Sequence, residues 1–450
     1  MAKPVTSSTT SLVPETSPET QVSTKRLETL EVATANLLAW LRSMHQEGGF
    51  GGPVAHWWQN RFRYTGIGLD WRYEGILIGY KLLASKTGDV DRFRSLTEQA
   101  VSDLRAGQTA DGHLTASRFE MNPDTVGTPH EAAASLGLLE VLPLLTDPEP
   151  ALECAKRNVD ALIQALWDEP RRGFNDGLHA VGRVPNKLAT FAQTLMTLAN
   201  VTGDDAYLDY ARAALDDVIN YQLTDGPQQG AIHQYAANAA RGDGRFFPYY
   251  NARCIPPLVM GAQVLADARY QDAAELTLNF LTATMNPDGS WPQIVYQGGA
   301  RAMWARWFAG TADTLLAYHA LGEMLPDAAV SRLLSSQLAS GGFMTAEGFA
   351  SQISQRAGAA LNYRDVMPVV GWNDKVLRLL STLLPKGTSL PDASTQDTTV
   401  AIRVGQQRAI YEETHDFIRI YTLKAPNTVL YDWKKSAPWA HVVHFPLEVR

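Results

Sequence analysis

The sequence is poor in cysteine, with only Cys154 and Cys254 among 450 residues. Two isolated cysteines without a Cys-x-x-Cys spacing exclude a disulfide framework and provide no zinc motif. Their scarcity is typical of a reducing compartment. We therefore expect a cytoplasmic protein that uses no metal and no cofactor.

Long apolar runs and concentrated basic charge are also missing. No segment approaches the ~20 consecutive apolar residues of a membrane-spanning helix, and the Ser-, Thr- and Pro-rich start lacks the apolar core of a secretory signal. The net charge is −8, and no stretch gathers the basic residues that a nucleic-acid backbone requires. We expect a soluble chain with a disordered tail over 1–24, no transmembrane segment and no nucleic-acid partner.

Apolar side chains are abundant, at 45% of all residues, and so is glycine, with 34 copies. From about residue 25 to 385 one unit recurs, consisting of an apolar segment with helical periodicity, a short turn, an amphipathic segment and a glycine-rich stretch. Turn formers at 87–89 and 202–204 separate the two segments, as in antiparallel helical hairpins. We expect such hairpins at 74–105 and 188–221, among others.

A glycine-centred signature follows the second segment of each unit. Its copies begin at Gly48, Asp111, Arg172, Asp225, Asp288 and Gly341. They lie about 50 to 65 residues apart, which is the length of two helices with their loops. Helical hairpins repeated in this way form an open solenoid or a closed ring, and we predict a ring of six.

The signature resembles that of the (α/α)6 toroids. Segments 108–114 and 337–343 are similar to the Gln-x-x-x-Gly-x-aromatic pattern of terpenoid cyclases and prenyltransferases, with Leu114 in the aromatic place of the first. Six-hairpin glycosidases, sugar epimerases and polysaccharide lyases share the fold. The resemblance implies an all-α (α/α)6 toroid over 25–385, without pointing to one family.

The composition of the sequence changes after Pro385. A polar linker over 386–397 precedes segments rich in β-branched and aromatic residues at 400–404, 417–423 and 441–445. We expect a β-rich extension over 398–450 that packs on the ring.

Polar and aromatic residues gather at the expected start of the first helix in each unit. Several of these starts follow long connections, such as 108–129 and 224–248, and long loops in compact domains are usually functional. In a closed ring the starts converge on one face. The residues that mark them are Asp70, Trp71, Arg72, His130, Glu131, Asn186, Lys187, Tyr249, Tyr250, Asn251, Arg253, Trp304, Arg306, Trp307, Trp372, Asn373 and Asp374.

Each of these residues also has a structural interpretation. Asp70 and Asn373 are residue types preferred as helix N-caps, and the tryptophans are suited to packing between units. Capping does not explain Arg72, Arg253 or Arg306. We therefore favour a functional site to which residues from several helix starts contribute.

The residues required for several kinds of catalysis are missing from the sequence. The Asp-x-Asp-Asp run that the cyclase resemblance implies is absent, and Cys254 has no suitably placed Asp for the zinc site of the prenyltransferases. There is no Gly-x-Ser-x-Gly nucleophile elbow, and no second His follows His130-Glu131 at metalloprotease spacing.

Tryptophan faces, tyrosine hydroxyls and arginine forks suit sugar rings and carboxylates. The cationic residues Arg72, Lys187, Arg253 and Arg306 favour an anionic, uronate-containing glycan. We assign substrate contacts to Trp71, Arg72, Lys187, Tyr249, Trp304, Arg306, Trp307, Trp372 and Asn373.

Two mechanisms remain open. In a lyase or epimerase, Asn251 and Arg253 would bind the uronate carboxylate while Tyr250 or His130 moves the proton. In a glycoside hydrolase, two carboxyl groups flank the bond. The carboxylic acids available for that role are Asp70, Glu74, Glu131 and Asp374.

A third hypothesis is a terpenoid cyclase-like or non-catalytic toroid that binds a glycan or a protein in polysaccharide biosynthesis. Such a protein would keep the aromatic lining without an acid and base pair. Proximity of Tyr250, His130 and Arg253 favours proton abstraction, whereas facing carboxyl groups favour hydrolysis.

Overall fold

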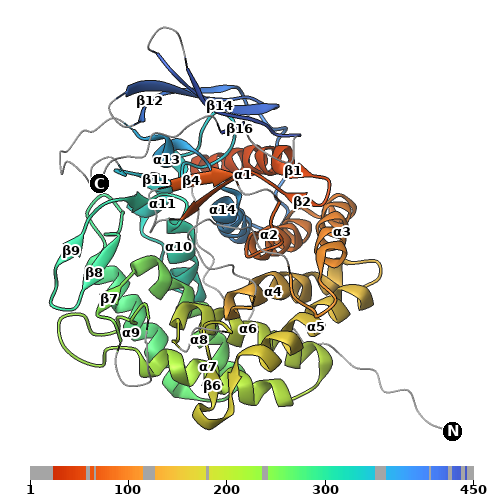
Figure 1. Cartoon of the computed structure of the whole chain (residues 1–450), viewed down its shortest axis with the longest axis vertical. Helices are drawn as coiled ribbons and strands as arrows, with labels where there is room; N and C mark the ends of the chain where they lie inside the picture. The colour runs from red at the N-terminus through yellow and green to blue at the C-terminus, as the bar shows by residue number, and fades with distance from the viewer. Residues whose placement is uncertain are drawn as a thin grey trace.

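A ring of helices in two concentric layers makes up most of the molecule, and a β-sheet lies against one side of it (Figure 1). The computed structural model describes residues 24–56, 61–64, 67–114, 127–178, 182–235, 242–349, 361–404, 407–423, 428–436 and 441–442. The expected long connections 108–129 and 224–248 lie partly outside these ranges.

The inner layer consists of helices that are buried over most of their surface, because their sequences are rich in small and apolar residues. Each contacts the next, and the last contacts the first, so the ring is closed. Within the described residues these helices are α2 (Arg72–Thr87), α4 (Ala132–Val141), α6 (Pro185–Thr202), α8 (Pro248–Val264), α10 (Thr311–Ala320) and α14 (Val370–Leu383).

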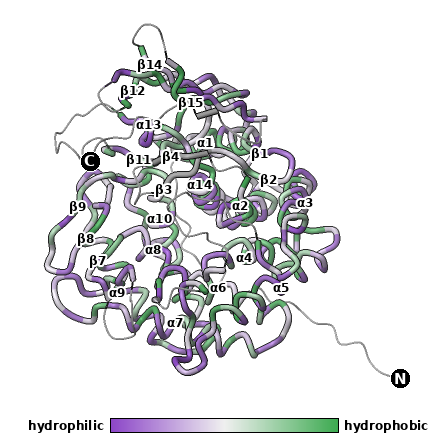
Figure 2. The backbone as a smooth tube through the Cα atoms, in the orientation of Figure 1, coloured by the Kyte–Doolittle hydropathy of each residue, from purple (hydrophilic) through white to green (hydrophobic). Residues whose placement is uncertain are grey.

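The outer layer consists of amphipathic helices that cover the inner ones. Figure 2 shows hydrophobic and hydrophilic stretches alternating along outer helices such as α5 and α7. Within the described residues the outer helices are α1 (Thr24–Met44), α3 (Val90–Gly107), α5 (Glu149–Leu166), α7 (Ala206–Asn220), α9 (Ala268–Thr284) and α11 (Asp327–Ser335). Helix α1 packs on α14, so one hairpin of the ring joins the first helix of the chain to the last inner one.

Short elements occupy the connections. The short helices are η1 (Pro129–Glu131), η2 (Leu142–Leu144), η3 (Glu169–Arg171) and α13 (Tyr363–Val366). The short strands are β1 (His45–Gln46), β2 (Gly49–Phe50), β3 (Pro53–His56), β4 (Arg61–Tyr64), β5 (Trp167–Asp168), β6 (Gly173–Phe174), β7 (Arg245–Phe246), β8 (Ile294–Tyr296), β9 (Arg301–Ala302), β10 (Arg306–Trp307) and β11 (Ala346–Glu347).

The signature loops attach each hairpin to the next one. Gln108 donates hydrogen bonds to the carbonyl of Gly112 and to a carbonyl of the following outer helix, and Gln337 does the same in its own unit. Gly112 has a φ of +94°, and a Cβ there would lie 2.7 Å from a backbone oxygen of α5. Both the left-handed backbone and the close approach therefore require glycine.

One signature position differs from the expected one. In the fourth unit Gln222 contacts the carbonyl of Gly230, and its bridge partner across the loop is Ile232. Gly226, which carries the signature in the sequence, has open space around its α-carbon. Gly230 is therefore the structural equivalent of Gly112, because this loop is longer than the others.

The C-terminal strands form an antiparallel sheet in the order β12-β13-β14-β15-β16 within the described residues. They are β12 (Thr398–Val404), β13 (Gln407–Glu413), β14 (Phe417–Thr422), β15 (Val429–Lys434) and β16 (His441–Val442). The expected strands at 400–404 and 417–423 correspond to β12 and β14, whereas most of 441–445 lies outside the described residues. Every helix in the described ranges is too short or too polar to cross a bilayer.

A buried carboxylate fastens the sheet to the ring. Glu413 of β13 is fully buried and accepts hydrogen bonds from Trp40 Nε1 (2.7 Å), Ser340 Oγ (2.7 Å) and Tyr411 Oη (2.8 Å). The ammonium of Lys435 lies 3.0 Å from the same carboxylate. Because Trp40 belongs to α1 and Ser340 lies in the loop after α11, this one side chain ties the sheet to an outer helix and to a signature loop.

We predict that Glu413→Ala lowers the free energy of unfolding by about 3 to 5 kcal/mol, because it leaves the Lys435 charge buried without a partner. The neighbouring Glu412 points to the opposite face of the sheet, so Glu412→Ala serves as the control and should change stability little. Denaturant titration followed by circular dichroism measures both. Equal effects of the two substitutions would contradict the fastening role of Glu413.

Candidate functional site

Glu74 lies at the centre of the ring and is almost fully buried in the first turn of α2. Arg253 of α8 donates to both of its oxygens, at 3.1 and 2.8 Å. From α14, Lys375 lies 3.2 Å away and Arg378 lies 2.8 Å away. Burial acts to raise the pKa of Glu74, but these three cations hold it well below its usual value. The carboxylate is therefore ionised at neutral pH.

Arg253 connects this carboxylate to two further inner helices. Its guanidinium lies 3.3 Å from Asp313 Oδ1 of α10 and 3.3 Å from Thr190 Oγ1 of α6. Asp313 is buried, and among the described residues its second oxygen, Oδ2, accepts no hydrogen bond. The guanidinium is thus committed to protein groups, while one Asp313 oxygen keeps unused hydrogen-bonding capacity.

Asp374 supplies a second carboxyl group to the cluster. Its Oδ2 accepts from the backbone N–H of Gly75 at 3.1 Å and from Lys375 Nζ at 2.5 Å, whereas its buried Oδ1 accepts no hydrogen bond within the described chain. Burial raises the pKa of Asp374 to about 7 against the opposing effect of Lys375, and repulsion from Glu74 and Asp313 adds to the rise. At neutral pH a substantial fraction of Asp374 therefore carries a proton.

A glycine makes this arrangement possible. A Cβ on Gly75 would lie 2.3 Å from the backbone oxygen of Asp374 and 2.6 Å from its carboxylate. Only glycine lets α2 approach α14 closely enough for the Gly75 N–H to reach the carboxylate.

Aromatic rings form a continuous wall beside the charged cluster. Trp372 lies 4.7 Å from Trp307 in a stacked arrangement and 4.8 Å from Tyr249, and Tyr249 in turn lies 4.7 Å from Tyr250. Burial raises the pKa of the Tyr249 hydroxyl well above its usual value, and Asp313 contributes to that rise. A small hollow opens along this wall, and Tyr249, Trp291, Gln293 and Trp307 are among its lining residues.

His130 stacks on Trp71, with ring centroids 5.5 Å apart and planes 6° apart. Desolvation lowers the pKa of His130 to about 3, and the charges of Arg253, Lys187 and Lys375 contribute to the shift. The imidazole is therefore neutral at physiological pH. Because Lys375 Nζ donates to the carbonyl of Trp71 at 2.9 Å, the stacked His130 lies next to the central cluster.

Three residues that the sequence suggested for catalysis or substrate binding hold loops in the structure. Asn251 accepts from the N–H of Ile232 and donates to its carbonyl, and Asn373 does the same with Phe343. Glu131 accepts from the N–H of Leu114 and is also engaged by His113, Asn158 and Gly127. These equivalent contacts anchor the signature loops. Both N–H groups of each asparagine are used, so neither amide is available to bind a carboxylate.

Asp70 and Arg72 also make internal contacts. The Arg72 guanidinium pairs with Asp70 at 2.7 Å and donates to the carbonyl of Phe50 at 2.6 Å. Lys187 pairs with Asp176 at 2.8 Å. Asn186 is buried, and within the described residues its side-chain oxygen accepts no hydrogen bond.

The fifth inner helix begins later than the sequence suggested. Arg306 and Trp307 form strand β10, paired with β11, and α10 starts only at Thr311. Arg306 pairs with Asp288 and Glu347 and lies 4.3 Å above the ring of Trp304. Of this group, only Trp307 joins the aromatic wall.

The structure therefore brings together Arg253, Asp374, Tyr249, Tyr250, Trp372, Trp307, His130 and Trp71 of the expected residues. From the sequence, no role was expected for Asp313, Lys375 or Arg378. The available signal was a charge inside an otherwise apolar helix, as in the Thr-Ala-Asp-Thr run at Asp313. Among the described residues, no group of three or more His, Cys, Asp or Glu side chains is placed to hold a metal ion.

Asp374 should also make stability depend on pH. The folded chain holds this proton up to about pH 7, whereas an unfolded aspartate releases it near pH ~3.9. Between these values the folded state binds more protons, so the free energy of unfolding falls as pH rises from about 4 to 7. We predict that Asp374→Asn removes a change on the order of 2 kcal/mol between pH 5 and pH 7.

Denaturant titrations of the wild type and Asp374→Asn across this pH range measure the effect, with the exposed Asp392→Asn as the matched control. A stability difference between wild type and Asp374→Asn that stays constant with pH would show that Asp374 ionises normally in the folded state.

The comparisons with known proteins identify the fold. No protein-family model and no curated protein matches the sequence. A crystal structure of a D-mannose isomerase superposes with a TM-score of 0.60 at 13% identity, covering 78% of this chain and 97% of that one. An unsaturated glucuronyl hydrolase from Bacillus sp. GL1, responsible for the degradation of glycosaminoglycan, gives 0.57 at 15% identity over 82% and 98%.

A sugar epimerase from a ruminal bacterium gives a TM-score of 0.57 at 14% identity, covering 79% of this chain and 97% of that one. At such identities the likeness establishes architecture alone. It confirms the fold predicted from the repeated signature: the chain is an (α/α)6 toroid of the six-hairpin kind, with a small β-sheet appended.

Proposed function

We propose that this protein is an enzyme that processes carbohydrate, and that Asp374 and Asp313 act as its acid and base in hydrolysis of a glycosidic bond. The observation that carries the proposal is a pair of buried carboxyl groups at the centre of the ring, each with one oxygen that accepts no hydrogen bond among the described residues. The two groups repel each other, which raises the pKa of Asp374.

The environments of the two carboxyl groups suit different roles. Asp374, with its pKa raised to about 7, is able to donate a proton to the departing glycosidic oxygen. Asp313 is paired with the cation of Arg253, and its second oxygen is available to accept a proton from water.

The surrounding residues fit a sugar. Trp372, Trp307 and Tyr249 present the aromatic surface on which sugar rings stack. The similar structures are of proteins named as a mannose isomerase, a sugar epimerase and a glucuronyl hydrolase, which adds support for a carbohydrate substrate. Arg253 is committed to Glu74 and Asp313, so we assign it the role of positioning the carboxyl groups rather than binding a uronate.

Proton abstraction by a lyase or epimerase is the second candidate, and the position of His130 favours it. The imidazole is neutral, and Lys187, Arg253 and Lys375 act on it electrostatically. In this mechanism His130 removes the proton beside the carboxylate of a uronate.

Asp374→Asn and Asp313→Asn should each lower kcat by at least about 100-fold, because general acid and base groups typically contribute that much. Neutral and uronate oligosaccharides serve as substrates, and reducing ends report hydrolysis. The activity of the wild type should fall as pH rises through about 7, because Asp374 loses its proton.

The exposed Asp392→Asn is the control and should retain full activity. Hydrolysis that persists in Asp374→Asn would remove this residue from the mechanism. Unsaturated or epimerised uronate products that disappear in His130→Asn, but not in Asp374→Asn, would replace hydrolysis with proton abstraction.

A further inference from the structure

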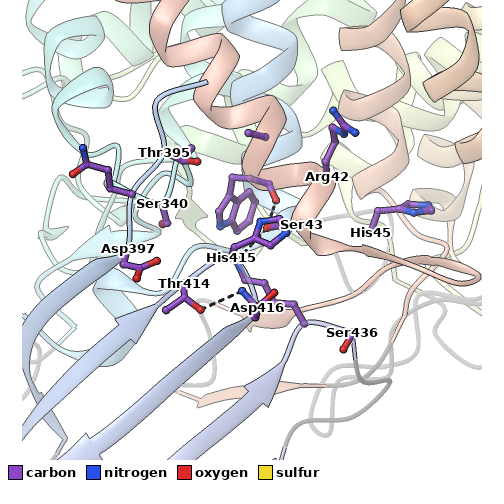
Figure 3. A pocket seen from close by; sticks show the side chains of 14 residues that line it. Arg42, Ser43, His45, Ser340, Thr395, Asp397, Thr414, His415, Asp416 and Ser436 are labelled. Atoms are coloured by element: carbon purple, nitrogen blue, oxygen red, sulfur yellow. Dashed lines mark hydrogen bonds between the residues drawn. The ribbon is translucent and has the colours of Figure 1, made fainter. Parts of the chain in front are cut away.

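A polar groove with a volume of about 550 Å³ lies at the junction between the ring and the C-terminal sheet. Arg42 and Ser43 of α1 line one wall. Asp397, just ahead of β12, and the turn 414–416 between β13 and β14 line the other. In Figure 3 the side chains of Ser43, Thr414, His415 and Asp416 lie close together, whereas the Arg42 side chain points away from them. None of the residues that line the groove belongs to the central cluster or to the aromatic wall.

The buried network around Glu413 fixes the floor of the groove. Trp40, Ser340 and Lys435 line the groove and each contacts the Glu413 carboxylate. Lys435 Nζ also lies 3.1 Å from Ser43 Oγ, so the network reaches the wall formed by α1. Because these contacts join the sheet to the helix, they hold the two walls at a fixed separation. A groove held in this way loses little conformational freedom when it binds a ligand.

The walls present unused hydrogen-bonding groups. Arg42, Asp397 and Asp416 are exposed, and within the described part of the chain none of their side chains takes part in an ion pair. Hydroxyl groups of Thr395 and Ser436 lie among them. Carboxylate and guanidinium groups offer paired acceptors and paired donors, which match two neighbouring hydroxyl groups on one molecule.

The charges of the groove select the kind of ligand. Lys435 is neutralised by Glu413, and His45 pairs with Asp103 at 2.7 Å. The remaining charged side chains are the two carboxylates and Arg42, with the exposed His415 beside them. Two carboxylates disfavour a phosphate or a uronate, and the polar lining disfavours an apolar molecule. A neutral molecule rich in hydroxyl groups fits both conditions.

We propose that this groove is a second carbohydrate-binding site, which holds a short neutral oligosaccharide outside the ring. Its volume lies within the range of about 300 to 1,000 Å³ that is usual for small-molecule sites. The site stands apart from the central carboxyl groups, so the proposal does not rest on the function proposed for them. A chain that proved inactive would still bind sugar here.

Carbodiimide labelling of the full chain, read by mass spectrometry, tests the site. The probes are mannotriose, maltotriose and cellotriose at millimolar concentration, with a uronate trisaccharide and inorganic phosphate for comparison. At least one neutral trisaccharide should slow the labelling of Asp397 and Asp416. Labelling of Asp392, which is exposed in the same connection but does not line the groove, should not change.

Calorimetric titration of variants completes the test. Asp397→Ala combined with Asp416→Ala should weaken binding of the protecting trisaccharide at least about tenfold, and Asp392→Ala should leave it unchanged. Both groups are exposed, so circular dichroism should show a folded chain. Failure of every neutral trisaccharide to protect Asp397 and Asp416 overturns the proposal, and so does protection by phosphate or the uronate alone.

Discussion

The ion pair between Glu74 and Arg253 is the contact on which the architecture of the ring and its proposed chemistry both depend. It joins α2 to α8 across the ring, and the same guanidinium reaches Asp313 of α10. Charges buried this deeply are tolerated only when each has partners, because leaving one unpaired costs about 3 to 5 kcal/mol. The inner helices are therefore held where they satisfy the cluster, and the two carboxyl groups beside it are held with them.

Within this cluster, the pKa values of the neighbouring carboxyl groups of Glu74 and Asp374 shift in opposite directions. Three cations keep Glu74 ionised, whereas Asp374 has a single cation, Lys375, against burial and two neighbouring carboxylates. The fixed charge of Glu74 thus contributes to keeping the proton on Asp374. Removing water from a group raises the free energy of its charged form, and the ring supplies that desolvation by surrounding Asp374 with helices.

The fold could be predicted from the sequence because the same glycine-centred signature recurs along the chain. At Gly112, Gly230, Gly289 and Gly341 the signature repeats the same local need for a left-handed glycine, because a Cβ there would lie within 3 Å of the backbone of a neighbouring outer helix. The site was harder to predict. Asn251 and Asn373 lie at helix starts as catalytic groups would, and only the structure shows that backbone groups of distant loops occupy them. Asp313 was not predicted as a site residue, because strand β10 occupies the position where the start of the inner helix was expected.

The pairing of α1 with α14 joins the first helix of the ring to its last inner helix. Lys375 and Asp374 belong to this last inner helix, yet they contact Glu74 and Gly75 of the first. During synthesis Glu74 emerges before Arg253, Lys375 and Arg378, so its full set of counter-charges is present only once α14 has been made. The carboxylate cluster at the centre of the ring is therefore completed by the same contacts that close the ring.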